Sequence, residues 1–142
     1  LQTHQTDFIW DVKHIRGGLV DVEFITQYLQ LLHAHEHPEI LSRSTAQALK
    51  NLSEKGLLTP EISNDLQDAL HLWGGLQGLL RLTIPRELRK RRQHEIPESL
   101  QEKLATMSGA DNFAALMDKM AATAKTTLAH FNTLVADPAE KL

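Results

Sequence analysis

Residues 11–24 of the chain read Asp11-Val-Lys-His-Ile-Arg-Gly-Gly-Leu-Val-Asp-Val-Glu-Phe24. The pair Gly17-Gly18 interrupts the chain, and no glycine or proline follows until Pro38. Between these breaks apolar side chains recur at intervals of three and four, at Val22, Ile25, Leu29 and Leu32. Such spacing gathers side chains on one face of a helix. We therefore predict an amphipathic helix from Leu19 to about His35.

Two more helices are predicted in the middle of the chain. The first runs from Ser44 to Lys55 and ends at Gly56. The second begins at Thr59-Pro60, because threonine can cap a helix and proline suits its first turn. Its apolar positions alternate four and three up to about Leu82, at Ile62, Leu66, Ala69, Trp73, Leu76 and Leu80. Gly74, Gly75 and Gly78 interrupt this helix, so a partner backbone should approach closely there, or the helix should bend.

The sequence pattern in the last part of the chain predicts a short helix followed by a long one. Pro97-Glu98 starts the short helix, which ends near Gly109. Asp111 is expected to cap the long helix, and Asp137-Pro138 to end it. No stretch alternates like a β-strand. The predicted fold class is all-α: a lead-in arm with the Gly-Gly motif (residues 1–18), then a single bundle of about five helices (residues 19–142).

The amino-acid composition excludes several classes of protein. A chain of 142 residues suits one domain, and 5% aromatic content implies a core of aliphatic side chains. Without cysteine there is no disulfide scaffold, thiolate metal site or thiol nucleophile, which fits a cytoplasmic protein. No apolar run approaches the roughly 18 residues of a membrane span. We therefore expect no membrane association, and the net charge of -3 does not favour nucleic acid.

The segment before the first helix is the best candidate for a binding site. Lys13 and Arg16 precede Gly17-Gly18, and Asp21 follows in the first helical turn. Two glycines let a backbone approach a ligand closely, and the first N–H groups of a helix can bind an anion. The alternative is a plain turn, with solvated cations and with acidic side chains that stabilise the helix through its dipole. In either case Asp21 should be partly buried and bonded to Lys13, Arg16 or a backbone N–H.

Three other clusters of ionisable residues do not predict a catalytic or metal-binding site. Asp21 and Glu23 diverge by about 200° on a helix, so they should not share a metal ion. His33 and His37 stand four apart, as zinc-binding histidines do, but the helix ends between them and no thiolate supports them. We expect a helix-terminal cluster without metal. A basic stretch, Arg86, Arg89, Lys90, Arg91 and Arg92, lacks interleaved aromatic residues and predicts a solvated loop that can face a partner.

Residues 9–41 closely resemble a known family. The run Asp11-Val-Lys13, Arg16-Gly17-Gly18-Leu-Val-Asp21-Val-Glu23-Phe24-Ile25 and the segment from His33 to Leu41 are similar to the bifunctional glutamine synthetase adenylyltransferase/adenylyl-removing enzyme. A looser form of the motif occurs in the related uridylyltransferase of the PII signal protein. The resemblance implies the helical domain that follows the C-terminal, adenylylating nucleotidyltransferase domain.

The resemblance implies a role without catalysis for this chain. In the family an upstream nucleotidyltransferase domain carries a Gly-Ser turn and an Asp-x-Asp pair that hold magnesium and the phosphates of ATP. No such Gly-Ser and Asp-x-Asp pattern occurs here. We therefore expect no catalytic or metal-binding residue and an inactive isolated chain. Lys13, Arg16, Gly17 and Gly18 become candidates for contact with nucleotide or with the catalytic domain, and Asp21 anchors their loop.

Two alternatives remain open. One is a regulatory module that binds PII protein or glutamine synthetase through the helical surface, with the basic stretch as its supporting feature. The other is the equivalent helical domain of a PII uridylyltransferase. In each case the expected partners are the upstream nucleotidyltransferase domain, glutamine synthetase and PII protein.

Overall fold

The structure is a computed structural model that describes residues 11–83 and 97–140. These residues form helices and turns without a β-sheet, so the predicted all-α class is confirmed. The helices are α1 (Leu19–His33), α2 (Thr45–Glu54), α3 (Pro60–Thr83), α4 (Glu98–Met107), α5 (Phe113–Phe131) and the short α6 (Asp137–Glu140). A 3-10 turn, η2 (Pro38–Ile40), and a π-helical turn, η5 (Asn132–Ala136), complete the list.

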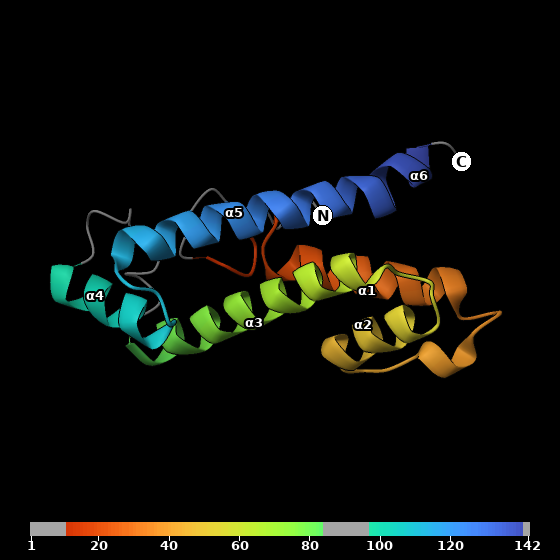
Figure 1. Cartoon of the computed structure of the whole chain (residues 1–142), viewed down its shortest axis with the longest axis horizontal. Coiled ribbons are helices and arrows are strands. Elements are labelled where there is room, and N and C mark those ends of the chain that lie inside the picture. The colour runs from red at the N-terminus through yellow and green to blue at the C-terminus, as the bar shows by residue number, and fades with distance from the viewer. Residues whose placement is uncertain (1–10, 84–96, 141–142) are drawn as a thin grey trace.

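The three longest helices form the body of the molecule. Helix α5 lies along α3, and α1 contacts both of them. Helix α4 packs on α5 at one end, and α2 packs on α1 and α3 at the other (Figure 1). No described helix is long and apolar enough to cross a membrane.

Capping side chains mark where three of the described helices begin, α2, α3 and α5. The hydroxyl of Ser44 accepts a hydrogen bond from the Gln47 N–H (3.2 Å), and the hydroxyl of Thr59 accepts one from Ile62 (3.3 Å). Both satisfy N–H groups that lack a partner inside the helix. The cap of α5 was predicted one residue too early. Asn112, not Asp111, accepts from the Ala115 N–H at 2.8 Å.

The predicted end of the last helix was also wrong. The chain stays helical through η5 and continues into α6, past Pro138. The Asp137 N–H bonds to the Asn132 carbonyl across the wider π turn. Pro138 therefore lies in the first turn of a new α-helical segment, where a residue without an N–H is tolerated.

The core has two parts, both of which α1 and α3 help to build. The first lies between α3, α4 and α5 and buries Val12, Leu19, Val22, Ala69, Leu72, Trp73, Leu76, Leu80, Leu104, Ala105, Leu116 and Met120. The second lies between α1, η2, α2 and η5 and buries Ile25, Leu29, Ile40, Leu49, Leu52, Leu58, Leu66 and Val135. The apolar seam predicted for α3 is confirmed, with Ile62 half-buried and its other members buried.

The end of α1 departs from the predicted pattern. Leu32, expected on the apolar side, is 58% exposed, and the neighbouring Leu31 is 80% exposed. Gln30, by contrast, is buried although it is polar, and it accepts a hydrogen bond from the Ser42 N–H at 2.8 Å. The returning chain after η2 covers Gln30 and leaves the two leucines outside, which spacing within one helix does not reveal.

Candidate functional site

The chain folds back on itself before it enters α1. The N–H of Gly18 donates to the Ile15 carbonyl (2.9 Å) and that of Leu19 to the Val12 carbonyl (3.0 Å). The Val20 N–H donates to the Lys13 carbonyl at 2.9 Å. Val12 is only 2% exposed and belongs to the core beside α3 and α5. The lead-in from Asp11 is therefore a packed turn.

Gly17 lies against the backbone of α5. It has a φ of +78°, a conformation that glycine adopts without steric cost. A Cβ built on it would overlap the carbonyl oxygen of Ala124 and would lie 2.7 Å from the carbonyl carbon. A Cβ on Gly18 would lie 2.8 Å from the Ile15 carbonyl oxygen. The glycine pair thus permits close approach to the protein's own chain, above all to α5.

Asp21 closes the turn from inside the helix. Its carboxylate accepts a hydrogen bond of 2.6 Å from the Gly17 N–H, and the residue is 6% exposed. Among the partners expected for it, the backbone N–H is the one that the structure shows. A buried hydrogen bond to an ionised acceptor is among the stronger kinds, so Asp21 holds Gly17 in place.

Most of the N–H groups around the start of α1 that could bind an anion already have an acceptor. Those of Gly17, Gly18, Leu19 and Val20 are all donated within the chain. Lys13 and Arg16, by contrast, are exposed. The turn therefore presents two cationic side chains on a closed, rigid base, and any anion would meet these side chains first.

The acidic pair in α1 does not form a metal site. The Asp21 carboxylate is buried and committed to Gly17, while Glu23 is half-buried two residues further along the helix. Across residues 11–83 and 97–140, no three His, Asp or Glu side chains are placed to hold a metal ion.

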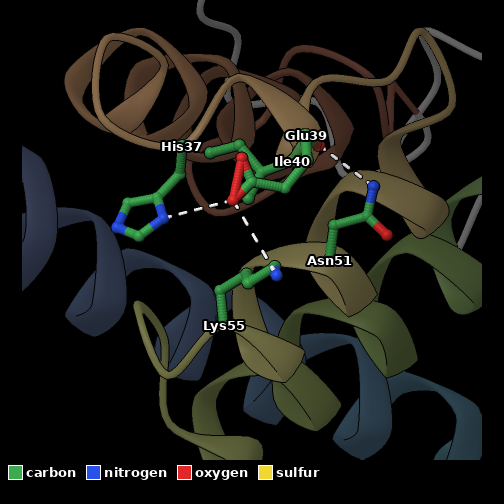
Figure 2. Close-up of polar contacts among 5 residues, drawn as sticks. All are labelled: His37, Glu39, Ile40, Asn51 and Lys55. Atoms are coloured by element: carbon green, nitrogen blue, oxygen red, sulfur yellow. Dashed lines mark hydrogen bonds and ion pairs between the residues drawn. The ribbon is translucent and has the colours of Figure 1, made fainter.

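The histidine-rich end of α1 contributes to a structural corner. Figure 2 shows the Glu39 carboxylate between His37 and Lys55: Nδ1 of His37 lies 3.3 Å from Oε1 of Glu39, and Nζ of Lys55 lies 3.8 Å from the same oxygen. The Asn51 amide donates to the Ile40 carbonyl at 3.0 Å. These contacts fix η2 onto α2.

The surroundings of the Glu39 carboxyl lower its pKa. The hydrogen bond from its own backbone N–H lowers the pKa of the carboxyl, and slight burial opposes this. The His37 side chain and the positive charge of Lys55 lower the pKa further. These interactions favour the charged carboxylate, so the corner keeps its anionic centre under mildly acidic conditions.

Nothing in the sequence points to the role of Ala124. Its carbonyl group faces Gly17 from α5, more than a hundred positions along the chain. An alanine inside a helix carries no signal for such a contact. The basic stretch from Arg86 to Arg92 and the apolar residues Phe8, Ile9 and Trp10 lie outside the described residues.

Comparisons with known proteins match a uridylyltransferase family model and several adenylyltransferases. The family model described as GlnD PII-uridylyltransferase matches residues 2–135. A bifunctional glutamine synthetase adenylyltransferase/adenylyl-removing enzyme of Rhodopseudomonas palustris is 36% identical over 129 residues, which is 91% of this chain and 13% of the relative. Its namesake from Xanthobacter autotrophicus is 47% identical over 76 residues, or 54% of this chain and 8% of the relative.

A third similar protein has the same name. It comes from Bradyrhizobium diazoefficiens and is 37% identical over 116 residues, which is 79% of this chain and 11% of the relative. The chain thus spans only about an eighth of the length of such relatives. No solved structure was found to match it.

Proposed function

The chain belongs to the GlnD PII-uridylyltransferase family, and we propose that it is the helical domain of a cytoplasmic nucleotidyltransferase that adenylylates glutamine synthetase. The observation that carries this proposal is the 36% identity over 91% of the chain to a glutamine synthetase adenylyltransferase. The Gly-Gly turn supports it, because its compact geometry requires glycine where the family resemblance is densest.

In this proposal the turn serves as a contact platform for the catalytic domain. Lys13 and Arg16 lie on a base fixed by the bond from Gly17 to Asp21 and by close packing on α5. A fixed backbone limits where the two exposed side chains can reach, and arginine can bind phosphate oxygens in pairs. Lys13 and Arg16 would contact the nucleotide phosphates or acidic groups of the catalytic domain, while Gly17, Gly18 and Asp21 position them.

Magnesium and ATP belong to the intact enzyme and not to this chain. The described residues do not fit a magnesium site, because Asp21 is committed to Gly17 and no group of three carboxylate or histidine side chains converges. The catalytic carboxylates would come from the upstream nucleotidyltransferase domain. Glutamine synthetase, as substrate, and PII protein, as regulator, are the further partners that this proposal implies.

The test replaces Lys13 and Arg16 by alanine, singly, in the full-length enzyme. Loss of one charge-assisted hydrogen bond to phosphate costs about 1.4 kcal/mol or more. We therefore expect either kcat to fall or the KM for ATP to rise by about tenfold. Lys50→Ala and Lys103→Ala are matched controls, since both lysines are exposed on other helices. The isolated chain is expected to transfer no adenylyl group to glutamine synthetase. Unchanged kinetics in both variants, or turnover by the isolated chain, would refute the assignment.

The description of the matching family favours a second candidate. Its model is that of a PII-uridylyltransferase and covers residues 2–135. The same turn would then support transfer of a uridylyl group to PII protein. The full-length enzyme distinguishes the two candidates by its acceptor: modification of glutamine synthetase with ATP supports the first, and modification of PII protein with UTP supports the second.

A further inference from the structure

The contact between Gly17 and α5 brings a third cation to the entry turn. A Cβ on Gly17 would lie 2.8 Å from the Cα of Ala124, so the two Cα atoms are within about 4.5 Å of each other. Consecutive Cα atoms are about 3.8 Å apart, which places the Cα of Lys125 within about 12 Å of that of Arg16. Lys125 is exposed on α5, as Arg16 is on the turn. Two cations that are more than a hundred positions apart in the chain are therefore neighbours in the fold.

Helical geometry places Lys125 on the side of α5 that is turned away from α3. His130 faces α3, because its Nε2 lies 2.9 Å from the Asp65 carboxylate. Each residue advances about 100° around a helix, so Ala124 lies about 120° and Lys125 about 220° around α5 from His130. The entry turn packs at Ala124, and Lys125 follows on the exposed side of that contact. Lys125 therefore belongs to the edge formed by the turn and not to the side of α3.

Lys13, Arg16 and Lys125 have no ionic partner within residues 11–83 and 97–140. The cations that form ion pairs in this part of the chain are His14, His37, Lys55 and His130. On α5, the positions three and four residues before and after Lys125 carry only alanine and leucine, so no helical neighbour can pair with it. The three positive charges are therefore available to a ligand.

The carboxylates of the turn already have partners. Asp21 is buried and accepts the bond from the Gly17 N–H, and Asp11 lies 3.2 Å from Nδ1 of His14. The acidic residue of α5, Asp118, is seven positions before Lys125, or roughly 10 Å along the helix axis. The edge around the contact of the turn with α5 thus has an excess of positive charge.

We propose that Lys13, Arg16 and Lys125 together bind the polyphosphate chain of a nucleotide. This assignment rests on the proposed function, in which the intact enzyme uses a nucleoside triphosphate. It adds Lys125 as a binding residue, which spacing along the sequence does not connect with the Gly-Gly motif. The entry turn and α5 each carry part of the site, and the contact between Gly17 and Ala124 joins the two parts.

A polyphosphate fits this group of cations better than a single carboxylate does. It carries several negative charges within a short length, so cations from two segments can bind it at once, and arginine can hold two of its oxygens. The backbone N–H groups from Gly17 to Val20 already have acceptors, so the side chains hold the ligand. Because these side chains are exposed, salt should weaken the binding.

The first test measures the binding of inorganic tripolyphosphate to the 142-residue chain by calorimetry, without magnesium. We expect saturable binding that weakens as salt is added. Lys125→Met removes one charge-assisted contact and should weaken binding about tenfold, as should Arg16→Met. Lys119→Met is the matched control, because Lys119 is an exposed lysine of the same helix that lines a cleft with α3. It should change binding by less than about twofold, since salt screens a distant charge.

The second test measures nucleotide kinetics in the full-length enzyme. Lys125→Met should raise the KM for ATP about tenfold with little change in kcat, since it removes a contact that binds substrate and transition state alike. Lys125→Arg keeps the charge and should stay close to the original KM. Lys119→Met again serves as the control, and circular dichroism checks that each variant is folded.

Four results would overturn the proposal. The first is the absence of saturable tripolyphosphate binding, and the second is an unchanged KM for ATP in Lys125→Met. The third is an equal loss of affinity in folded Lys119→Met and Lys125→Met, because the attraction is then a general effect of charge. The fourth is binding of a glutamate-rich peptide but not of tripolyphosphate, since the cations then contact protein carboxylates.

Failure of the proposed function gives a different result. A full-length enzyme that modifies neither glutamine synthetase nor PII protein would contradict the proposed function. Binding of tripolyphosphate to the 142-residue chain, and its loss in Lys125→Met, do not depend on which acceptor the enzyme modifies. The binding test therefore judges the cation site by itself.

Discussion

Glycines serve opposite purposes in two parts of this molecule. At the entrance to α1, Gly17 and Gly18 are buried, and a Cβ on either would overlap the protein's own backbone. On α3, Gly74, Gly75 and Gly78 are exposed, and a Cβ on any of them would meet no described atom within 4 Å. The first group is required by the fold as the structure shows it. The second group is not explained by any contact among the described residues.

The sequence left two interpretations of the Gly-Gly pair open, close approach to a ligand or a plain turn. In the structure Gly17 packs against α5. The α3 glycines were expected to pack against another backbone or to mark a bend. Within the described residues no backbone approaches them, and α3 is one continuous helix from Pro60 to Thr83. A glycine in a sequence indicates room for close approach but does not say what approaches.

The largest effect is expected from Gly17→Ala. A side chain in the left-handed region costs about 1–2 kcal/mol, and overlap with a backbone that cannot rotate away costs about 1–3 kcal/mol more. We therefore expect the free energy of unfolding to fall by about 3 kcal/mol, measured by urea denaturation. Because the free energy of unfolding of a single domain is only about 5–15 kcal/mol, this change would remove much of the stability.

Gly56→Ala is the matched control for Gly17→Ala. Gly56 has a similar φ of +72°, but a Cβ added to it meets no described atom within 4 Å. It should therefore show the conformational cost alone, about 1 kcal/mol. Equal losses in the two variants would mean that the contact with Ala124 does not matter, and the contrast between the two groups of glycines would fail.

The sequence was informative where a pattern stays within one helix. The seam from Leu66 to Leu80 and the cap at Thr59 depend on neighbours a few residues apart, and the structure confirms them. It was uninformative where the deciding contact joins distant segments. Burial of Gln30 depends on Ser42 after η2, and the packing of Gly17 depends on Ala124.

The candidate site also has one part that the sequence indicated and one that it did not. Lys13 and Arg16 were found from their charge and their position before a glycine pair, and the structure places both on the surface. The N–H groups of the helix start were candidates for anion binding, but those of Gly18, Leu19 and Val20 are donated within the turn. Local spacing marks where a helix begins, whereas only the folded backbone shows which of its donors remain free.

A second, smaller effect is expected from Asp21→Ala. This change leaves the buried Gly17 N–H without its acceptor, and an unsatisfied buried donor costs about 1–3 kcal/mol. We expect a loss of about 2 kcal/mol in the free energy of unfolding, together with faster hydrogen exchange at the Gly17 amide.

Two further variants show whether the hydrogen bond to Asp21 is responsible. Asp21→Asn keeps an acceptor oxygen and should lose only about 1 kcal/mol. Glu23→Ala, at a half-buried position two residues away, should stay within about 0.5 kcal/mol of the original protein. If Glu23→Ala destabilises as much as Asp21→Ala, the effect belongs to helix charge and not to the turn.

The smallest effect, and the only one of opposite sign, is expected on α3. Alanine is favoured over glycine inside a helix by about 1 kcal/mol, and the exposed sites of Gly74 and Gly78 have room for a methyl group. Gly74→Ala and Gly78→Ala should each raise the free energy of unfolding by up to about 1 kcal/mol in urea denaturation. A loss of stability in either variant would show that a part of the chain outside the described residues packs on this face. A gain in both would mean that these two glycines lower the stability of the domain and that no contact within it requires them.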